Sequence, residues 1–222
     1  MKVPIFVFIF LLGSSAWAQR ITNVFVDLGM NHSGIIYSND LFFYLARNDF
    51  KKHFNPNFNA SAGLEIKLKN RLNLMPSIGL RNSGTKYDIL VTTAQYPDGT
   101  PSNIVYKFQQ ITLPLTIGYN FGKQFQIKPL IGIVNNYNLK TFAISSYDDY
   151  SFSVSDYKKY YLNFIGGVMF SHTTLFNSKL GLGLKITYEK SLMDLDHYSK
   201  MTSSQNIVNA SLMLIYKLPS KN

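Results

Sequence analysis

Apolar side chains recur at every second position in several separate segments of the chain. Between residues 60 and 68 the odd positions are polar, charged or glycine, and the even positions are Ala60, Ala62, Leu64, Ile66 and Leu68. Successive side chains of a β-strand point to opposite faces of a sheet. The period of two therefore predicts a strand with one apolar face and one polar face.

The same alternation predicts further strands along most of the chain. They fall near residues 24–30, 72–80, 111–121, 125–133, 162–170, 180–188 and 208–218, which gives about eight strands in total. Short connections predict hairpin turns at 70–71, 122–123 and 173–178. Long connections separate the hairpins at 33–58, 88–105, 139–159 and 193–205.

Short turns that alternate with long loops are typical of outer-membrane barrels, whose turns face the periplasm and whose loops face outward. We therefore predict an all-β fold. The expected architecture is a transmembrane antiparallel up-and-down β-barrel of about eight strands, with short periplasmic turns and long extracellular loops.

Residues 1–18 have the pattern of an export signal. Lys2 supplies a positive charge, residues 3–12 are apolar, and Ala16-Trp17-Ala18 forms an A-x-A cleavage site. The apolar stretch is much shorter than the roughly twenty residues that a spanning helix needs, and an uncleaved anchor is the alternative. We predict a signal peptide at 1–18 and an outer-membrane barrel domain at 19–222. The chain has no cysteine, so disulfide bonds do not hold the exported protein together.

The two faces of the predicted strands differ in composition. The apolar face is bulky and almost free of charge, whereas the polar face is rich in glycine, at Gly29, Gly63, Gly79, Gly118, Gly132, Gly167, Gly181 and Gly183. Small residues suit the narrow interior of a small barrel, and bulky apolar residues suit lipid. A soluble ligand-binding barrel with the apolar face inside is the alternative, because a period of two fits both arrangements.

Charged residues on the polar face should meet inside the barrel. The phasing predicts that the inward charges are Asp27, Glu65 and Glu189 with Lys67, Arg81, Lys128 and Lys185. Because buried charges are normally paired, we predict a lumen plugged by side chains. Aromatic belts are predicted at the two interfaces, with Tyr119, Phe121, Phe125, Phe170 and Tyr216 near the turns and Tyr137, Tyr160 and Tyr188 near the loops.

The net charge of +10 does not by itself indicate a nucleic-acid partner. The basic residues are spread along the chain, with no cluster denser than Lys51-Lys52 or Lys158-Lys159. We expect the partners to be outer-membrane lipid and lipopolysaccharide, since a phosphate-rich leaflet attracts a basic protein. A protein or surface ligand bound through the long loops is a further expected partner, nucleic acid is not, and we expect a monomer.

A family resemblance adds to this reading. The run YKFQQITLPLTIGYNFGKQFQIKPLIGIVNNY, residues 106–137, resembles the small outer-membrane β-barrel family of Bacteroidetes-type bacteria, the porin-like or PorT-like outer membrane protein beta-barrel domain. The resemblance rests on Leu113-Pro114-Leu115, a glycine turn, and a strand with Pro129 and Gly132. It implies the barrel fold and the outer membrane, and for most members no defined activity. Barrels of this kind often end on an aromatic residue in the last strand, whereas here Tyr216 and Leu218 are followed by residues 219–222.

The sequence carries no recognisable catalytic, cofactor or metal motif. It has no Gly-rich phosphate loop, no G-x-S-x-G and no H-E-x-x-H, and cysteine-ligated zinc sites are excluded. The histidines are scattered, at His32, His53, His172 and His197. Neighbouring Ser171 and His172 should point to opposite faces of a strand, so they cannot act together. A calcium site usually needs about six to eight oxygen ligands. The loop carboxylates Asp148, Asp149, Asp194 and Asp196 do not form a complete set of such ligands. We assign no catalytic, cofactor-binding or metal-binding residue.

The pattern favours a non-enzymatic outer-membrane barrel with a structural role or a binding role carried by its loops. The predicted loops hold many aromatic residues, among them Tyr37, Phe42, Phe43, Tyr44, Tyr96, Tyr147 and Tyr150. An accessory component of a secretion apparatus is an alternative that follows from the family resemblance alone. A lipid-modifying barrel enzyme and a soluble ligand-binding barrel are less favoured.

Overall fold

The computed structural model describes residues 21–37, 52–68, 71–91, 100–145, 150–153, 158–172, 175, 179–193, 195 and 203–219. Within these ranges the regular elements are β1 (Ile21–Tyr37), β2 (Lys52–His53), β3 (Pro56–Lys67), β4 (Leu72–Val91), β5 (Thr100–Tyr119), β6 (Phe125–Ser145), β7 (Tyr150–Ser153), β8 (Tyr160–His172), β9 (Leu180–Ser191) and β10 (Ser203–Lys217). No helix in this part of the chain is long and apolar enough to cross a membrane, a finding that concerns helices only.

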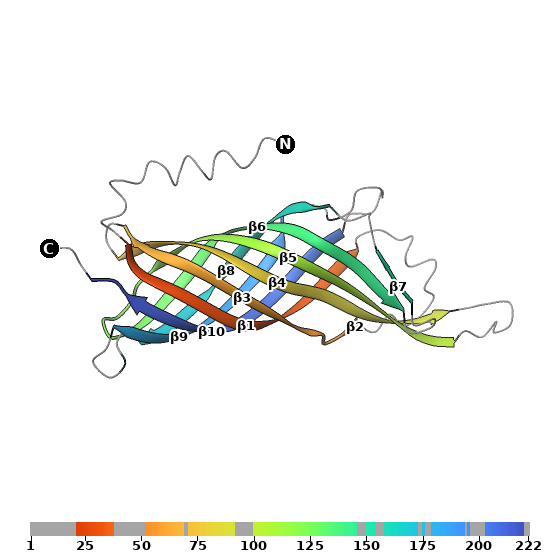
Figure 1. Ribbon diagram of the computed structural model, residues 1–222, viewed down its shortest axis with the longest axis horizontal. Helices are drawn as coiled ribbons and strands as arrows, with labels where there is room; N and C mark the ends of the chain where they lie inside the picture. The colour runs from red at the N-terminus through yellow and green to blue at the C-terminus, as the bar shows by residue number, and fades with distance from the viewer. Residues whose placement is uncertain are drawn as a thin grey trace.

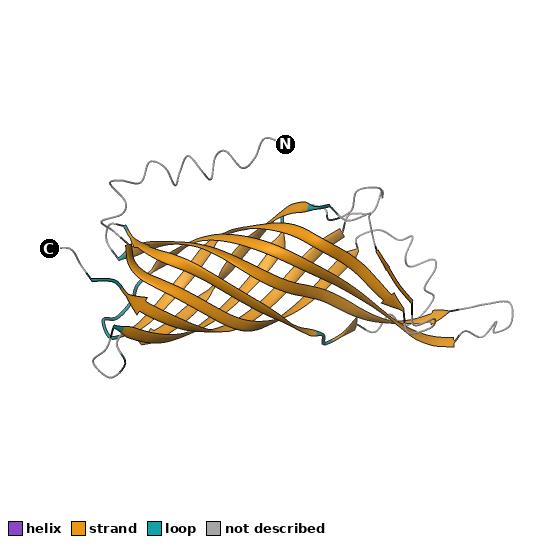
Figure 2. Ribbon diagram, in the orientation of Figure 1, coloured by secondary structure: helices purple, strands orange, loops and turns teal. Residues whose placement is uncertain are grey.

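Eight of these described strands close into a barrel (Figure 1). Neighbours follow the order β4, β3, β1, β10, β9, β8, β6 and β5, and the pairing of β4 with β5 completes the ring. Each barrel strand pairs antiparallel with the next one along the chain, and β10 pairs with β1. The short strands β2 and β7 add to the edges of β4 and β6. The predicted antiparallel up-and-down barrel is confirmed, and strands make up nearly all of its wall (Figure 2).

Two tight turns have the backbone geometry that a short connection requires. Arg71 precedes β4 with a φ of 68°, and Gly122 lies between β5 and β6 with a φ of 92°. Glycine adopts a positive φ at little cost because it has no Cβ. Phe121 and Ile127 exchange two backbone hydrogen bonds across the second turn, at 2.9 and 3.0 Å. The hairpins around these turns are confirmed, and β8 and β9 pair on either side of the third connection, most of which lies outside the described residues.

Three neighbouring strands extend further than the sequence pattern predicts. β4, β5 and β6 have 20, 20 and 21 residues, about twice the length that a membrane-spanning strand needs. At the end away from the tight turns they project beyond most of the barrel (Figure 1). The prediction of loops is therefore wrong for parts of 88–105 and 139–159, and also for 33–37 in β1. Backbone pairing continues here, as between Val91 and Thr100, although the lipid-facing alternation has ended.

Bulky apolar side chains cover the outside of the barrel. Leu212 of β10 and Leu28 of β1 are cross-strand partners, and they are 69% and 64% exposed. The lumen holds mainly polar residues and glycine, together with one apolar cluster of Phe25, Met75, Leu130, Met169, Met213 and Ile215. The apolar face is thus the outer face, which is the reverse of a soluble ligand-binding barrel.

One predicted inward residue lies at the open turn end of the lumen and is exposed there. Lys67, at the end of β3, is exposed, whereas the neighbouring Ile66 is buried. Lys67 keeps the inward register, because it pairs with the buried Asn73 of β4. Its exposure reflects its place at the open turn end, where it lines a hollow together with Glu65 and Asn73.

Candidate functional site

An ion pair between Arg81 of β4 and Glu189 of β9 crosses the lumen. Nη1 of Arg81 lies 2.7 Å from Oε1 of Glu189, and both side chains are buried. The guanidinium also donates hydrogen bonds to Asn136 and, at 3.1 Å, to Oε1 of Gln110. Asn163 donates to the second carboxylate oxygen of Glu189 at 3.0 Å. These partners replace the water that the two charges lose on burial.

A closed ring of hydrogen bonds lies next to this ion pair, toward the loop end. Gln110 donates to the hydroxyl of Tyr161, and Tyr161 donates to Oε1 of Gln205. Gln205 donates to Ser83, and Ser83 donates back to Oε1 of Gln110. The four residues come from β5, β8, β10 and β4, and their side chains are buried. Only β4 and β5 among these four strands are neighbours in the wall, so the ring connects opposite sides of the barrel, and its bonds polarise one another.

Two further ion pairs lie toward the turn end of the lumen. Lys185 of β9 contacts Asp27 of β1, and Lys128 of β6 contacts Glu65 of β3. Phe25 lies along β1 between these two ion pairs. Asp27 is two residues after it on the same inner face, and Asn23, two residues before it, is the register partner of Glu65. The predicted network of inward charges is confirmed for these residues and for Arg81 with Glu189, and Lys67 is not part of it.

The space left in the middle of the barrel is small. A cavity of about 50 Å³ remains between the Arg81–Glu189 and Asp27–Lys185 pairs. Oδ1 of Asp27 and Oγ1 of Thr187 belong to residues that line it, and neither atom has a hydrogen-bond partner in the protein. The cavity has room for a few water molecules, whereas sites for small organic ligands measure roughly 300–1,000 Å³. The middle of the lumen is therefore filled by its own side chains, and a hollow of about 450 Å³ lies at its turn end, lined by Glu65, Lys67 and Asn73 among others.

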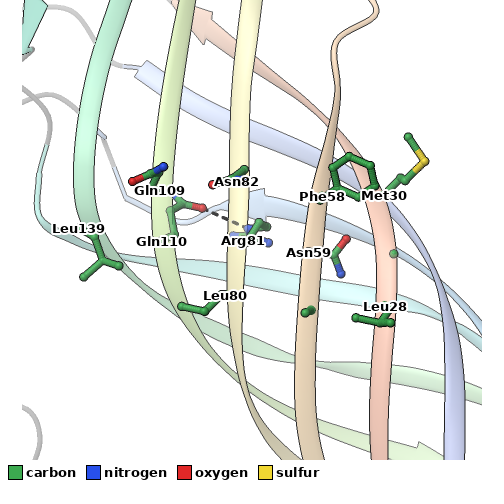
Figure 3. Close-up of a pocket in the computed structure, with 12 residues that line it drawn as sticks. Leu28, Met30, Phe58, Asn59, Leu80, Arg81, Asn82, Gln109, Gln110 and Leu139 are labelled. Atoms are coloured by element: carbon green, nitrogen blue, oxygen red, sulfur yellow. Dashed lines mark hydrogen bonds between the residues drawn. The ribbon is translucent and has the colours of Figure 1, made fainter.

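A larger hollow lies on the outer surface of the wall formed by β1, β3, β4, β5 and β6 (Figure 3). We call it the wall groove; its volume is about 660 Å³, and its outward lining residues are Leu28, Met30, Phe58, Ala60, Leu80, Asn82, Gln109 and Leu139. Ala60 contributes to the depression, since this small residue pairs with Leu28 on one side and Leu80 on the other. Asn82 and Gln109, at the loop end, are its outward polar residues. Sequence reasoning missed this groove, because a small residue in an apolar stripe gives only a weak signal.

The structure also gives the positions of several predicted aromatic, serine and histidine residues. Phe121, Phe125 and Tyr216 are exposed near the turns, and Tyr137, Tyr160 and Tyr188 are exposed toward the loops. Ser171 is buried and His172 is half-buried, as opposite faces of β8 require. Among the described residues no three acidic or histidine side chains gather in a way that could hold a metal ion. Predictions for His197, Asp148, Asp149, Asp194 and Asp196 fall outside the described residues, as does the side chain of His53.

Comparison with protein families identifies the barrel. Residues 17–197 match the family described as outer membrane protein beta-barrel domain. The chain belongs to this family. Family membership and the closed barrel together place its spanning strands in the outer membrane. No curated protein sequence matches the chain.

Several solved outer-membrane barrels are similar to this family member at low sequence identity. Ail, the attachment invasion locus protein of Yersinia pestis, solved in complex with the heparin analogue sucrose octasulfate, is 12% identical, with 88% of this chain and 99% of that chain covered and a TM-score of 0.47. OprG of Pseudomonas aeruginosa is 9% identical, with coverages of 90% and 97% and a TM-score of 0.44. Neisserial surface protein A is 11% identical, with coverages of 86% and 96% and a TM-score of 0.43.

Proposed function

We propose that the protein is a non-enzymatic outer-membrane barrel with a closed lumen, which presents a binding surface outside the cell. The observation that carries the first part is the layered plug, in which three ion pairs and a hydrogen-bond ring join strands across the interior. Buried charges satisfied in this way hold side chains in fixed positions. A barrel filled like this has no passage for solutes.

The second part is supported by the unequal height of the barrel wall. β4, β5 and β6 continue beyond the apolar band, and β7 extends the sheet by pairing with Phe142–Ser145 of β6. A strand extension costs ordering entropy and is not needed to span lipid. Rigid scaffolds that raise loops above a surface commonly carry recognition. We infer that this projecting sheet is the scaffold for a protein or surface ligand, and that the protein acts as a monomer.

Planar-bilayer recording of the purified, folded protein tests the closed lumen. We expect no stable conductance steps for the natural chain. Arg81→Ala removes one partner of the central ion pair and leaves space in the lumen, so this variant should show transient openings. Stable large conductance from the natural chain would overturn the proposal of a plugged barrel.

A shortened hairpin tests the binding surface. Tyr87 of β4 and Ile104 of β5 are register partners, so joining them through an Asn-Gly turn removes the outer part of the hairpin and keeps the barrel. We expect the shortened protein to retain heat-dependent gel mobility and to lose adhesion of expressing cells to host or neighbouring cell surfaces. Equal adhesion by the shortened and natural proteins would contradict a binding role for this extension.

The absence of catalysis is tested through the membrane lipids. The buried and half-buried positions of Ser171 and His172 leave this pair without a shared face, which is our reason for proposing no lipid-modifying activity. We expect mass spectra of outer-membrane lipids to be the same in a strain with the protein and in a deletion strain. A lipid species that changes on deletion and returns with the natural gene would show that the barrel is an enzyme.

A further inference from the structure

Three lysines lie together on the outer face of the projecting wall. Lys86, Lys107 and Lys140 come from the adjacent strands β4, β5 and β6. Lys107 pairs with Gly84 and with Phe142, so Lys86 and Lys140 are each displaced from it by two residues along a neighbouring strand. Such diagonal neighbours are about 7–8 Å apart. We call these residues the lysine trio.

The outward direction of the trio follows from the neighbouring residues. Phe108 and Gln110 of β5 are buried, and Gln109 between them is exposed. Lys107 is two residues from Gln109 along the strand, so both residues point to the outer face. Lys140 is exposed and pairs with Gln109. Among the described residues, no ion pair links any of the three lysines to a carboxylate. The three ammonium groups are therefore not held in ion pairs by described residues.

The trio lies just above the edge of the apolar band. On β5 the outward residues change from Ile111 to Gln109 and then to Lys107. Four residues span about 13 Å along a strand, or roughly 10 Å along the membrane normal at the usual tilt of about 40°. A lysine has a long flexible stem that can reach back toward the interface. This height corresponds to the headgroup region of a bilayer, where lipid phosphates lie.

The wall groove lies directly below the trio. Gln109 and Leu139 line its end on β5 and β6, and Lys140 follows Leu139 in the chain. Figure 3 shows Leu139 on one side of β4 and the side chains of Leu28, Met30 and Phe58 on the other. The groove thus has apolar walls beside the spanning part of the barrel and three lysines at its outer edge.

We propose that the lysine trio and the wall groove form one binding site for a phosphorylated, multiply acylated glycolipid of the outer leaflet, of the lipopolysaccharide class. The lysines bind the phosphates, Asn82 and Gln109 donate to or accept from the sugar, and the groove takes an acyl chain against Ala60. Charge complementarity selects this occupant. An uncharged lipid could place an acyl chain in the groove, but it would have no phosphate to pair with the three lysines. The site rests on the proposed orientation with the projecting sheet outside the cell.

Native mass spectrometry of the folded protein in detergent with bisphosphorylated lipid A tests the site. We expect Lys86→Gln, Lys107→Gln and Lys140→Gln together to weaken lipid A binding, by about fivefold for each lysine removed. The matched control carries Lys67→Gln, Lys123→Gln and Lys179→Gln, which are exposed lysines at the turn end and should change binding less than twofold. Equal losses in the two triple variants, or no loss in the first, would overturn the site.

The groove is tested by a second pair of variants. Ala60→Phe fills the groove and should weaken lipid A binding severalfold while the barrel stays folded, because a bulky apolar side chain is tolerated on the lipid face. Ala62→Phe is the control, since Ala62 is also exposed, lies between Val26 and Ile78, and does not line the groove. Equal binding of Ala60→Phe and Ala62→Phe would overturn the acyl-chain part of the site.

Two more arms identify the ligand and separate this inference from the proposed function. Dephosphorylated lipid A and phosphatidylglycerol should both bind more weakly than bisphosphorylated lipid A; equal binding of either would overturn the assignment to a phosphorylated glycolipid. Heat-dependent gel mobility reports the barrel itself. A triple-lysine variant that keeps this mobility and still binds lipid A overturns the site alone, whereas loss of the mobility shift in the natural protein counts against the proposed function.

Discussion

Arg81 and Glu189 lie 108 residues apart in the sequence, yet their side chains meet at 2.7 Å in the middle of the barrel lumen. Removing one charge would leave the other buried without its partner, which costs about 3–5 kcal/mol. We therefore expect Arg81→Met to lower the free energy of unfolding by that amount in urea titrations of the folded protein in lipid. The readout is gel mobility or circular dichroism, because Trp17, the sole tryptophan, lies in the predicted signal peptide.

A double variant provides the control for this ion pair. Arg81→Met with Glu189→Gln removes both charges, so it should recover a large part of the stability lost in the single variant. If the loss of stability in the double variant equals the sum of the losses in Arg81→Met and Glu189→Gln, the two charges do not interact.

Tyr161 makes the second prediction, through the hydrogen-bond ring. Tyr161→Phe keeps the buried ring of the side chain and removes the hydroxyl that accepts from Gln110 and donates to Gln205 at 2.7 Å. Two buried amide groups then lose a partner, so we expect a loss of about 1–3 kcal/mol in the same urea titration. Tyr160→Phe is the control, since Tyr160 is exposed at the rim, and its loss should be less than about 1 kcal/mol. Similar losses for the two variants would contradict a structural role for the ring.

The third prediction concerns the lipid-facing surface. Leu212 is 69% exposed and lies on β10 between two outward apolar neighbours, Ala210 and Leu214. A charge at the middle of the bilayer is poorly solvated, so Leu212→Arg should destabilise the barrel by about 2–4 kcal/mol in lipid vesicles. Asn82→Arg, at the outer edge of the band, should cost about 0–1 kcal/mol. If the two arginines cost the same, the outer face of β10 does not contact the membrane interior.

The barrel could be predicted from the sequence because lipid and lumen impose opposite requirements on adjacent residues. Leu64, Ile78 and Leu115 alternate with polar or small residues, and this period of two is a local property of the chain. It predicted the strands that cross the membrane. It also predicted that Asp27, Glu65 and Glu189 face inward.

Two kinds of information were not present in that local pattern. The pairing of Glu189 with Arg81, and of Glu65 with Lys128, depends on barrel closure and stagger, which no single strand encodes. The outer parts of β4, β5 and β6 are held by backbone pairing although the apolar alternation has ended, so the period of two did not predict them. Lys67 keeps the predicted inward register but lies at the open turn end of the barrel, and a single strand does not encode where the barrel opens.

The last prediction tests how closely the wall strands approach one another. A Cβ added at Gly132 of β6 would lie 2.1 Å from the backbone oxygen of Leu115 and 2.8 Å from Cα of Thr116, so Ala cannot be accommodated unless the backbone of β5 moves. Gly166 of β8 has a single neighbour within 4 Å of the same position, the Phe164 ring at 3.7 Å. We expect Gly132→Ala to cost about 1–3 kcal/mol in urea titrations and Gly166→Ala to be neutral or stabilising by up to about 1 kcal/mol. The comparison tests how tightly β5 and β6 pair in the wall. Equal stabilities of Gly132→Ala and Gly166→Ala would show that these two strands can separate enough to admit a side chain.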